Sequence, residues 1–172
     1  MKLDQRCQRI ELILSDVDGV LTDGGVVFDN QGIEIKRFHI RDGLGIKLWQ
    51  WAGYQFGLVT GRASHIVRLR AAELGVQIVR QGVEEKLPAV RQILTELRLV
   101  PDQVCYVGDD LPDLPPMLNV GLAIAVADGS EDVRQSAHYV TKAPGGFGAI
   151  RETVELILKS QGRWTDLLQK YK

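Results

Sequence analysis

The sequence has few of the features that mark secreted, membrane or nucleic-acid-binding proteins. It contains only two cysteines, Cys7 and Cys105, and they form no metal-ligand spacing. Its 21 basic and 22 acidic residues leave a net charge of −1, which provides no basic surface for nucleic acid or an anionic membrane. No apolar run approaches the roughly 20 residues that span a bilayer, and the N-terminus lacks the apolar core of a signal peptide. We therefore expect a soluble cytoplasmic protein with no nucleic-acid or membrane partner.

The length and composition fit an ordinary globular protein. With 172 residues, of which 45% are hydrophobic and 25% charged, the chain can bury a sizeable core. We predict a single domain over residues 1–172, with a β-hairpin at about 25–40 and an amphipathic tail at about 163–172. The hairpin prediction rests on two β-rich runs that flank Asn30-Gln31-Gly32, where glycine suits the turn.

Short β-rich runs alternate with helical patterns along the chain. This alternation predicts an α/β fold: a three-layer, Rossmann-like, mainly parallel sheet with helices on both faces. Ser64 and Gly75 are expected to begin and end one of the helices. The predicted strands cover 12–16, 56–61, 76–81, 104–109, 122–126 and 139–141, and the predicted helices 42–52, 64–75, 86–99, 112–119, 130–137 and 148–162.

Polar residues follow the predicted strands at the points where they end. Asp16 and Asp18 follow the first strand, Thr60 ends the next, and Asp109 ends the strand at 104–109. Lys86 begins a helix just after another strand and its loop. Because ligand sites of parallel α/β sheets lie at the carboxyl ends of the strands, we expect these five residues to converge.

Carboxylates gathered in one place need a counter-charge, and Mg²⁺ with oxygen ligands can supply it. Thr60, Lys86 and loop amides beside glycine suit a phosphate group. The pattern therefore indicates phosphoryl transfer. A carboxylate such as Asp16 can form an aspartyl-phosphate, and a second carboxylate two residues on can protonate the leaving oxygen and later activate water.

Four stretches resemble, in order, the four motifs of the haloacid dehalogenase superfamily. They are Asp16-Val17-Asp18-Gly19-Val20, Thr60-Gly61-Arg62, Lys86 and Gly108-Asp109-Asp110-Leu111-Pro112-Asp113. Stretches such as RFHIRDGLGIKL and GLAIAVADG are similar to the small branch without a cap domain that contains 3-deoxy-D-manno-octulosonate 8-phosphate (KDO 8-phosphate) phosphatase. The resemblance covers about residues 10–162. It implies Mg²⁺-dependent hydrolysis of KDO 8-phosphate to KDO and phosphate, with KDO feeding lipopolysaccharide synthesis.

The resemblance also implies a role for each motif residue. Asp16 is expected to be the nucleophile and a magnesium ligand, and Asp109 the other metal-binding carboxylate. Asp18 is expected to act as general acid and base, with its backbone carbonyl on the metal. Thr60 and Lys86 are expected to bind the phosphoryl group. An aspartate at position 18 is also what separates phosphatases from the carbon–halogen cleaving members.

Further residues are expected around this centre. Asp113 is predicted to hold Lys86 or a metal-bound water, and Asp110 to lie nearby or cap the next helix. Gly61, Arg62, Arg41 and Arg70 are predicted substrate contacts, because arginine can bind a sugar-acid carboxylate with two hydrogen bonds. The alternative for these three arginines is an ordinary surface salt bridge, and the sequence leaves both roles open.

The resemblance implies two properties beyond the catalytic residues. Members of this branch use the hairpin to assemble a homotetramer whose neighbouring subunits help to close each active site. The family commonly has Gly-Gly-Arg-Gly near the C-terminus, whereas this chain has Phe147 in place of the arginine. That difference removes a possible substrate or interface contact and weakens the assignment of the substrate.

Three alternatives remain open from the sequence. The substrate could be a related nine-carbon sugar acid phosphate. A phospho-receiver signalling domain also places aspartates, a threonine and a lysine around Mg²⁺, although its motifs come in another order. A non-catalytic oligomerisation module is the third alternative, and the complete motif set argues against it.

Overall fold

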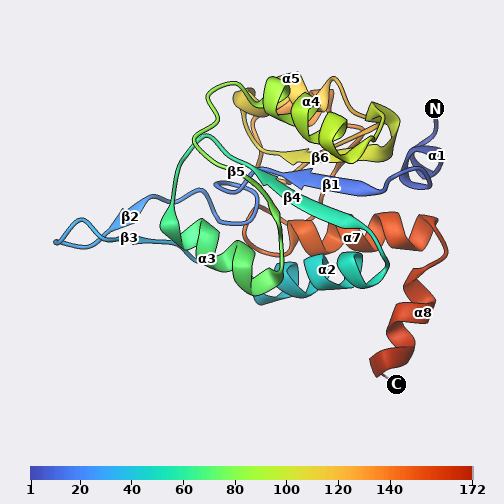
Figure 1. Ribbon diagram of the computed structural model, residues 1–172, viewed down its shortest axis with the longest axis horizontal. Helices are drawn as coiled ribbons and strands as arrows, with labels where there is room; N and C mark the ends of the chain where they lie inside the picture. The colour runs from blue at the N-terminus through green and yellow to red at the C-terminus, as the bar shows by residue number, and fades with distance from the viewer. Residues whose placement is uncertain (172) are drawn as a thin grey trace.

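A computed structural model describes residues 1–171 of the protein (Figure 1). Its centre is a parallel six-stranded sheet in the order β5-β4-β1-β6-β7-β8. The strands of this sheet are β1 (Leu12–Ser15), β4 (Gln55–Val59), β5 (Ile78–Arg80), β6 (Val104–Gly108), β7 (Leu122–Ala125) and β8 (Tyr139–Val140). The predicted parallel α/β fold is confirmed, and β1 lies in the middle of the sheet between β4 and β6.

Helices cover both faces of the sheet (Figure 1). One layer holds α2 (Ile40–Trp51), α3 (His65–Leu74) and α7 (Ala149–Ser160), with α1 (Leu3–Cys7) against α7. The other layer holds α4 (Lys86–Leu97), α5 (Leu114–Met117) and α6 (Glu131–Ser136). The helix α8 (Trp164–Leu168) follows α7, and 3-10 turns occupy Pro101–Gln103, Leu111–Asp113 and Gln169–Tyr171. No helix of residues 1–171 is long and apolar enough to cross a bilayer.

The strands are buried on both faces, which explains their nearly continuous apolar sequence. In β1, Ile13 packs into the core beneath α2, α3 and α7, whereas Leu12 and Leu14 pack into the core beneath α4, α5 and α6. Because side chains alternate across a strand, one short apolar run anchors both layers. Because β1 packs on both faces, its carboxyl end is fixed, and Asp16 follows directly after it.

The hairpin prediction is confirmed, but the paired segments are short. The strands β2 (Val27–Phe28) and β3 (Glu34–Ile35) pair antiparallel and extend away from the main sheet (Figure 1). Gly32 has φ +78° in the turn, as predicted. The second β-rich run, 33–40, is mostly not strand, because it returns to the body of the protein and leads into α2 at Ile40.

The remaining predicted elements are found with shifted ends. Ser64 lies at the start of α3, and Gly75 ends it with φ +68°. Ser64 does not cap the helix with its hydroxyl, because that hydroxyl donates to Glu34 at 2.7 Å instead. The predicted tail at 163–172 contains α8, and its last residue lies outside the described range.

Candidate active site

The ends of three adjacent strands bring the predicted motif residues together. The parallel register places Ser15 of β1 beside Leu58 of β4 and Val107 of β6. The residues that follow these strands therefore emerge at one edge of the sheet, Asp16 after β1 and Thr60 after β4. Asp109 follows β6 directly, and oxygens of Asp16 and Asp109 lie within 4.8 Å of one another. The roles predicted for these residues stay predictions.

Lys86 lies between two carboxylates at the start of α4. Its Nζ is 2.7 Å from Asp16 Oδ2 and 2.6 Å from Asp113 Oδ1, and its side chain is 3% exposed. The Asp113 side chain is 1% exposed. A buried ammonium is stable only when its charge is paired, and here two carboxylates pair it. The predicted contact between Asp113 and Lys86 is thus present.

Both carboxylate oxygens of Asp113 are engaged. Its Oδ1 also accepts a hydrogen bond from Tyr106 Oη at 2.8 Å, a contact that sequence reasoning missed. Its Oδ2 accepts from the backbone N–H of Asp109 at 3.0 Å and of Asp110 at 3.3 Å. Asp113 therefore fixes both Lys86 and the loop that carries Asp109. Tyr106 could not be identified from the sequence, because it lies within an apolar strand and belongs to none of the motifs.

Two glycines allow this close packing. Gly19 has φ +90°, and a side chain there would overlap the Asp109 carboxylate. A side chain at Gly108 would likewise overlap the side chain of Asp113. Glycine is therefore required at both positions for the carboxylates to approach the backbone.

The crowded carboxylates have perturbed acidity. Burial, together with the nearby charge of Asp113, raises the pKa of Asp16 to about 6 despite the opposing ammonium of Lys86. Burial, followed by the charges of Asp113 and Asp16, raises the pKa of Asp109 to about 8. Burial alone would lower the pKa of Lys86, but the charges of Asp16 and Asp113 raise it overall. The site thus holds more negative charge than Lys86 can balance.

The same carboxylates fit a divalent cation. Oxygen atoms from Asp16, Asp109 and Asp113 all lie within 4.8 Å of one another. Asp109 Oδ1 is buried and has no hydrogen-bond partner among the described residues. An unpartnered buried carboxylate oxygen beside other carboxylates is what a hard cation with oxygen ligands requires. Each oxygen of Asp113 already takes two contacts, whereas each oxygen of Asp16 takes one, from Val17 N or from Lys86 Nζ. Asp16 and the unpartnered Asp109 are therefore better placed than Asp113 to bind a cation.

Asp18 belongs to a second group of charges at the mouth of the site. Its carboxylate forms an ion pair with Lys36, and Arg62 Nε lies 3.9 Å from Asp18 Oδ2. Lys36 Nζ also lies 3.2 Å from Glu34 Oε1, which accepts from Arg62 Nη2 at 2.7 Å. Sequence reasoning did not identify Lys36 or Glu34 as site residues. The sequence held one indication: Glu34 and Lys36 are two residues apart on the second arm of the hairpin, so their side chains are expected on the same face of it.

The second motif lies beside these charges. Thr60 is 2% exposed at the end of β4, and its backbone N–H donates to the carbonyl of Arg80 at 2.9 Å. Gly61 and Arg62 follow in an exposed position. Of the four predicted substrate contacts, the structure thus brings Arg62 to Asp18 and places Gly61 beside it.

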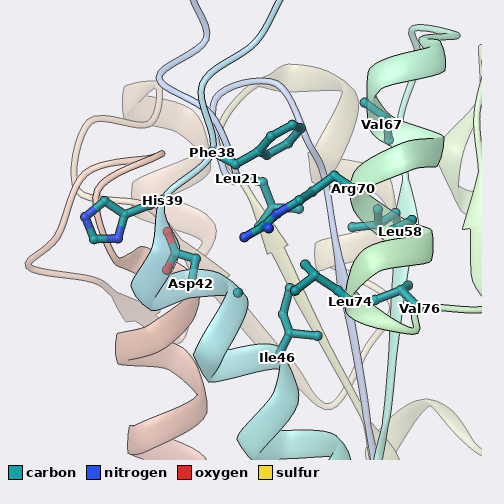
Figure 2. Close-up of a pocket in the computed structure, with 12 residues that line it drawn as sticks. Leu21, Phe38, His39, Asp42, Ile46, Leu58, Val67, Arg70, Leu74 and Val76 are labelled. Atoms are coloured by element: carbon teal, nitrogen blue, oxygen red, sulfur yellow. The ribbon is translucent and has the colours of Figure 1, made fainter.

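The other two predicted substrate contacts lie elsewhere. Figure 2 shows Arg70 reaching from α3 into a narrow, mainly apolar pocket against α2, and its guanidinium carbon lies 5.8 Å from the ring centre of Phe38. Arg70 Nη1 also donates to Glu73 at 2.8 Å. Arg41 lines a separate groove beside α7. Neither arginine is among the residues that contact the carboxylate cluster within the described chain, and their roles stay predictions.

Phe147, which replaces the family's usual arginine, lies next to a cation from the hairpin. The Phe147 ring is 48% exposed, and the Arg37 guanidinium carbon lies 5.0 Å from its centre. This distance is within the range of a cation–π contact. The same guanidinium donates to Asp23 Oδ2 at 2.6 Å, so its charge is already paired.

Comparisons with known proteins agree with this geometry. A family of haloacid dehalogenase-like hydrolases matches residues 69–145. A 3-deoxy-D-manno-octulosonate 8-phosphate phosphatase of Yersinia pestis is 43% identical over 159 residues, which cover 92% of this chain and 85% of that protein.

Two solved structures show the same fold over nearly the whole chain. A probable phosphatase of Pseudomonas syringae has a TM-score of 0.96 at 47% identity, covering 98% of this chain and 96% of that one. A 3-deoxy-D-manno-octulosonate 8-phosphate phosphatase of Moraxella catarrhalis, solved with magnesium, phosphate and KDO, has a TM-score of 0.96 at 37% identity. It covers 98% of this chain and 97% of the other.

Proposed function

This chain belongs to the haloacid dehalogenase-like hydrolases, in the family of the 3-deoxy-D-manno-octulosonate 8-phosphate phosphatases, and we propose that it hydrolyses KDO 8-phosphate to KDO and phosphate. The observation that carries the proposal is the Asp16–Lys86–Asp113 cluster with Asp109 beside it. Family membership favours this enzyme over the phospho-receiver domain. The complete set of catalytic side chains favours it over a non-catalytic module.

We assign the chemical steps to residues as follows. Asp16 attacks the phosphorus atom and forms an aspartyl-phosphate. Lys86 contacts its carboxylate and holds it in place at the end of β1. Asp18 donates a proton to the leaving sugar oxygen and later accepts one from the water that hydrolyses the intermediate. Thr60 and Lys86 bind the oxygens of the phosphoryl group.

Magnesium is the cofactor that fits this site. Asp16, Asp109 and the backbone carbonyl of Asp18 would hold it, and Mg²⁺ would supply positive charge to the phosphoryl oxygens during transfer. The unpartnered Oδ1 of Asp109 supports this assignment. A related phosphatase has been solved with a magnesium ion, phosphate and KDO.

Phosphate release from a panel of phosphorylated compounds tests the function. The panel contains KDO 8-phosphate, a nine-carbon sugar acid phosphate and simple sugar phosphates, each measured with Mg²⁺ and with EDTA. We expect KDO 8-phosphate to have the highest kcat/KM, and EDTA or Asp16→Asn to abolish turnover. Asp132→Asn, an exposed residue of α6, is the matched control and should keep full activity. Preference for the nine-carbon compound would contradict the substrate, and activity in EDTA would contradict the metal.

The hairpin supports a further proposal, that the protein is a homotetramer. Val27, Phe28 and Ile35 are 51%, 56% and 53% exposed, although apolar side chains on a two-stranded hairpin gain stability only when covered. Pairing of hairpins between subunits would cover them. The two free, buried cysteines suit a reducing cytoplasmic location, which we propose as well.

A charge placed in the hairpin tests the assembly. Phe28→Asp should reduce the molar mass measured by light scattering from that of a tetramer to that of a smaller species. Leu118→Asp is the matched control, because Leu118 is 67% exposed but lies after α5. A monomeric wild-type protein, or an unchanged mass in Phe28→Asp, would contradict the proposal.

A further inference from the structure

Lys36 differs from its neighbours on the hairpin in its burial. The apolar side chains around it are largely exposed, with Ile33 at 57% and Ile35 at 53%. The Lys36 side chain is only 1% exposed. Lysine is among the residues least often buried, and the hairpin therefore reverses the usual preference at this one position. The hairpin reaches back to the active site through this buried ammonium.

The contacts of Lys36 explain its burial. Its Nζ pairs with Asp18 Oδ1 and lies 3.2 Å from Glu34 Oε1. Glu34 is in turn fixed, since its Oε2 accepts from Ser64 Oγ at 2.7 Å. The result is a chain of contacts from the start of α3, through Glu34 and Lys36, to the carboxylate of Asp18. An exposed ion pair contributes little, but a shielded and anchored one restricts the geometry of its partner.

We propose that Lys36 is a positioning residue for Asp18, and that the hairpin contributes to catalysis through it. This inference rests on the proposed function, in which Asp18 protonates the leaving sugar oxygen. The anchored ammonium holds one oxygen of the Asp18 carboxyl group and so directs the other toward the leaving group. Without Lys36, Asp18 is left with Arg62 at 3.9 Å, which is outside hydrogen-bond distance.

The leaving group of the substrate separates this role from a purely structural one. A sugar alkoxide is a poor leaving group and needs the proton from Asp18 as its bond to phosphorus breaks. A p-nitrophenolate ion leaves without protonation. The value of kcat/KM reports the steps up to the departure of the leaving group. Loss of a residue that acts through Asp18 should therefore lower kcat/KM for the sugar phosphate and spare p-nitrophenyl phosphate.

The experiment compares these two substrates in Lys36→Met and in wild-type protein with saturating Mg²⁺. We expect the ratio of kcat/KM for KDO 8-phosphate to kcat/KM for p-nitrophenyl phosphate to fall by about 100-fold, as for a misplaced catalytic group. Lys159→Met is the matched control, because Lys159 pairs with Glu155 at 2.7 Å on α7, outside the site. Its ratio should equal that of wild-type protein.

Two outcomes would overturn the inference. Equal losses for both substrates would show that Lys36 supports binding or folding, and an unchanged ratio would show that Asp18 is positioned without it. If Lys36→Met does not fold or assemble as the wild-type protein does, Lys36→Gln replaces it in the same comparison. Failure of wild-type protein to hydrolyse either compound would instead contradict the proposed function.

Discussion

Lys86 and Asp113 form an ion pair of 2.6 Å in which both side chains are almost fully buried. Such a pair gains little stability over an apolar pair, but it is costly to break, because one charge is then left buried alone. Lys86 also contacts Asp16 at 2.7 Å, and the cost of losing it therefore extends to the nucleophile. The pair links the helix α4 to the loop after β6 and fixes the geometry of the site.

Replacing Lys86 should destabilise the fold as well as abolish activity. Lys86→Met leaves Asp16 and Asp113 without their shared counter-charge, and we expect a loss of about 3–5 kcal/mol in the free energy of unfolding. Urea denaturation in EDTA measures this loss. Lys159→Met breaks an exposed ion pair with Glu155 and should cost less than about 1 kcal/mol. Equal losses in the two variants would contradict the account of the cluster.

Asp109→Asn should have opposite effects on stability with and without metal. Burial, with the charges of Asp113 and Asp16, raises the pKa of Asp109 to about 8, above its value in the unfolded chain. Its contribution to stability is therefore present at low pH and is lost as the pH rises through about 8. At a pH above that value and in EDTA, the variant should unfold at a higher temperature than wild-type protein. Added Mg²⁺ should stabilise wild-type protein and leave the variant unchanged.

Thermal unfolding monitored by circular dichroism checks both parts. Asp110→Asn is the matched control, since Asp110 is exposed and adjacent in sequence. It should keep the stabilisation by Mg²⁺. Stabilisation of Asp109→Asn by Mg²⁺ to the wild-type extent would contradict the assignment of Asp109 as a ligand.

His138 should make stability depend on pH below neutrality. Burial, with the nearby charge of Arg6, lowers the pKa of His138, and its Nδ1 accepts a hydrogen bond from Ala123 N at 2.9 Å. The folded state thus favours the neutral ring. Its contribution is present above the ordinary histidine pKa of about 6.5 and is lost as the pH falls through the lower folded pKa.

The substitution His138→Asn isolates this effect, because asparagine can accept the same hydrogen bond but does not titrate. We expect the difference in unfolding free energy between wild-type protein and His138→Asn to shrink or reverse as the pH falls below about 6.5, the ordinary histidine pKa. A difference that stays constant with pH would contradict the prediction.

The sequence was sufficient to predict the parallel sheet and that Asp16, Asp109 and Lys86 lie together at one edge of it. Asp16, Thr60 and Asp109 follow short apolar runs, and the rule for parallel sheets places all such positions at one edge. Asp113 could be placed near Lys86 through the resemblance of its motif. The strand-end placements depend on local pattern and strand direction, whereas the placement of Asp113 depends on the family motif.

Contacts between distant loops could not be predicted in this way. Lys36 reaches Asp18 only because the hairpin folds back, and no spacing in the sequence gives the angle of its return. The sequence likewise does not show that the packing of α3 on α2 places Arg70 against Phe38, and its contact with the substrate stays a prediction. Such placements depend on how whole elements pack, which a periodic pattern does not determine.

In the proposed mechanism, Asp16 accepts the phosphoryl group, and Asp18 activates the water molecule that removes it. We would react Asp18→Asn with Mg²⁺ and p-nitrophenyl phosphate, whose leaving group needs no proton, quench the mixture in acid and analyse its peptides by mass spectrometry. The account predicts one added phosphoryl group on Asp16 and none in Asp16→Asn/Asp18→Asn. A phosphoryl group on another residue, or steady phosphate release by the double variant, would contradict it.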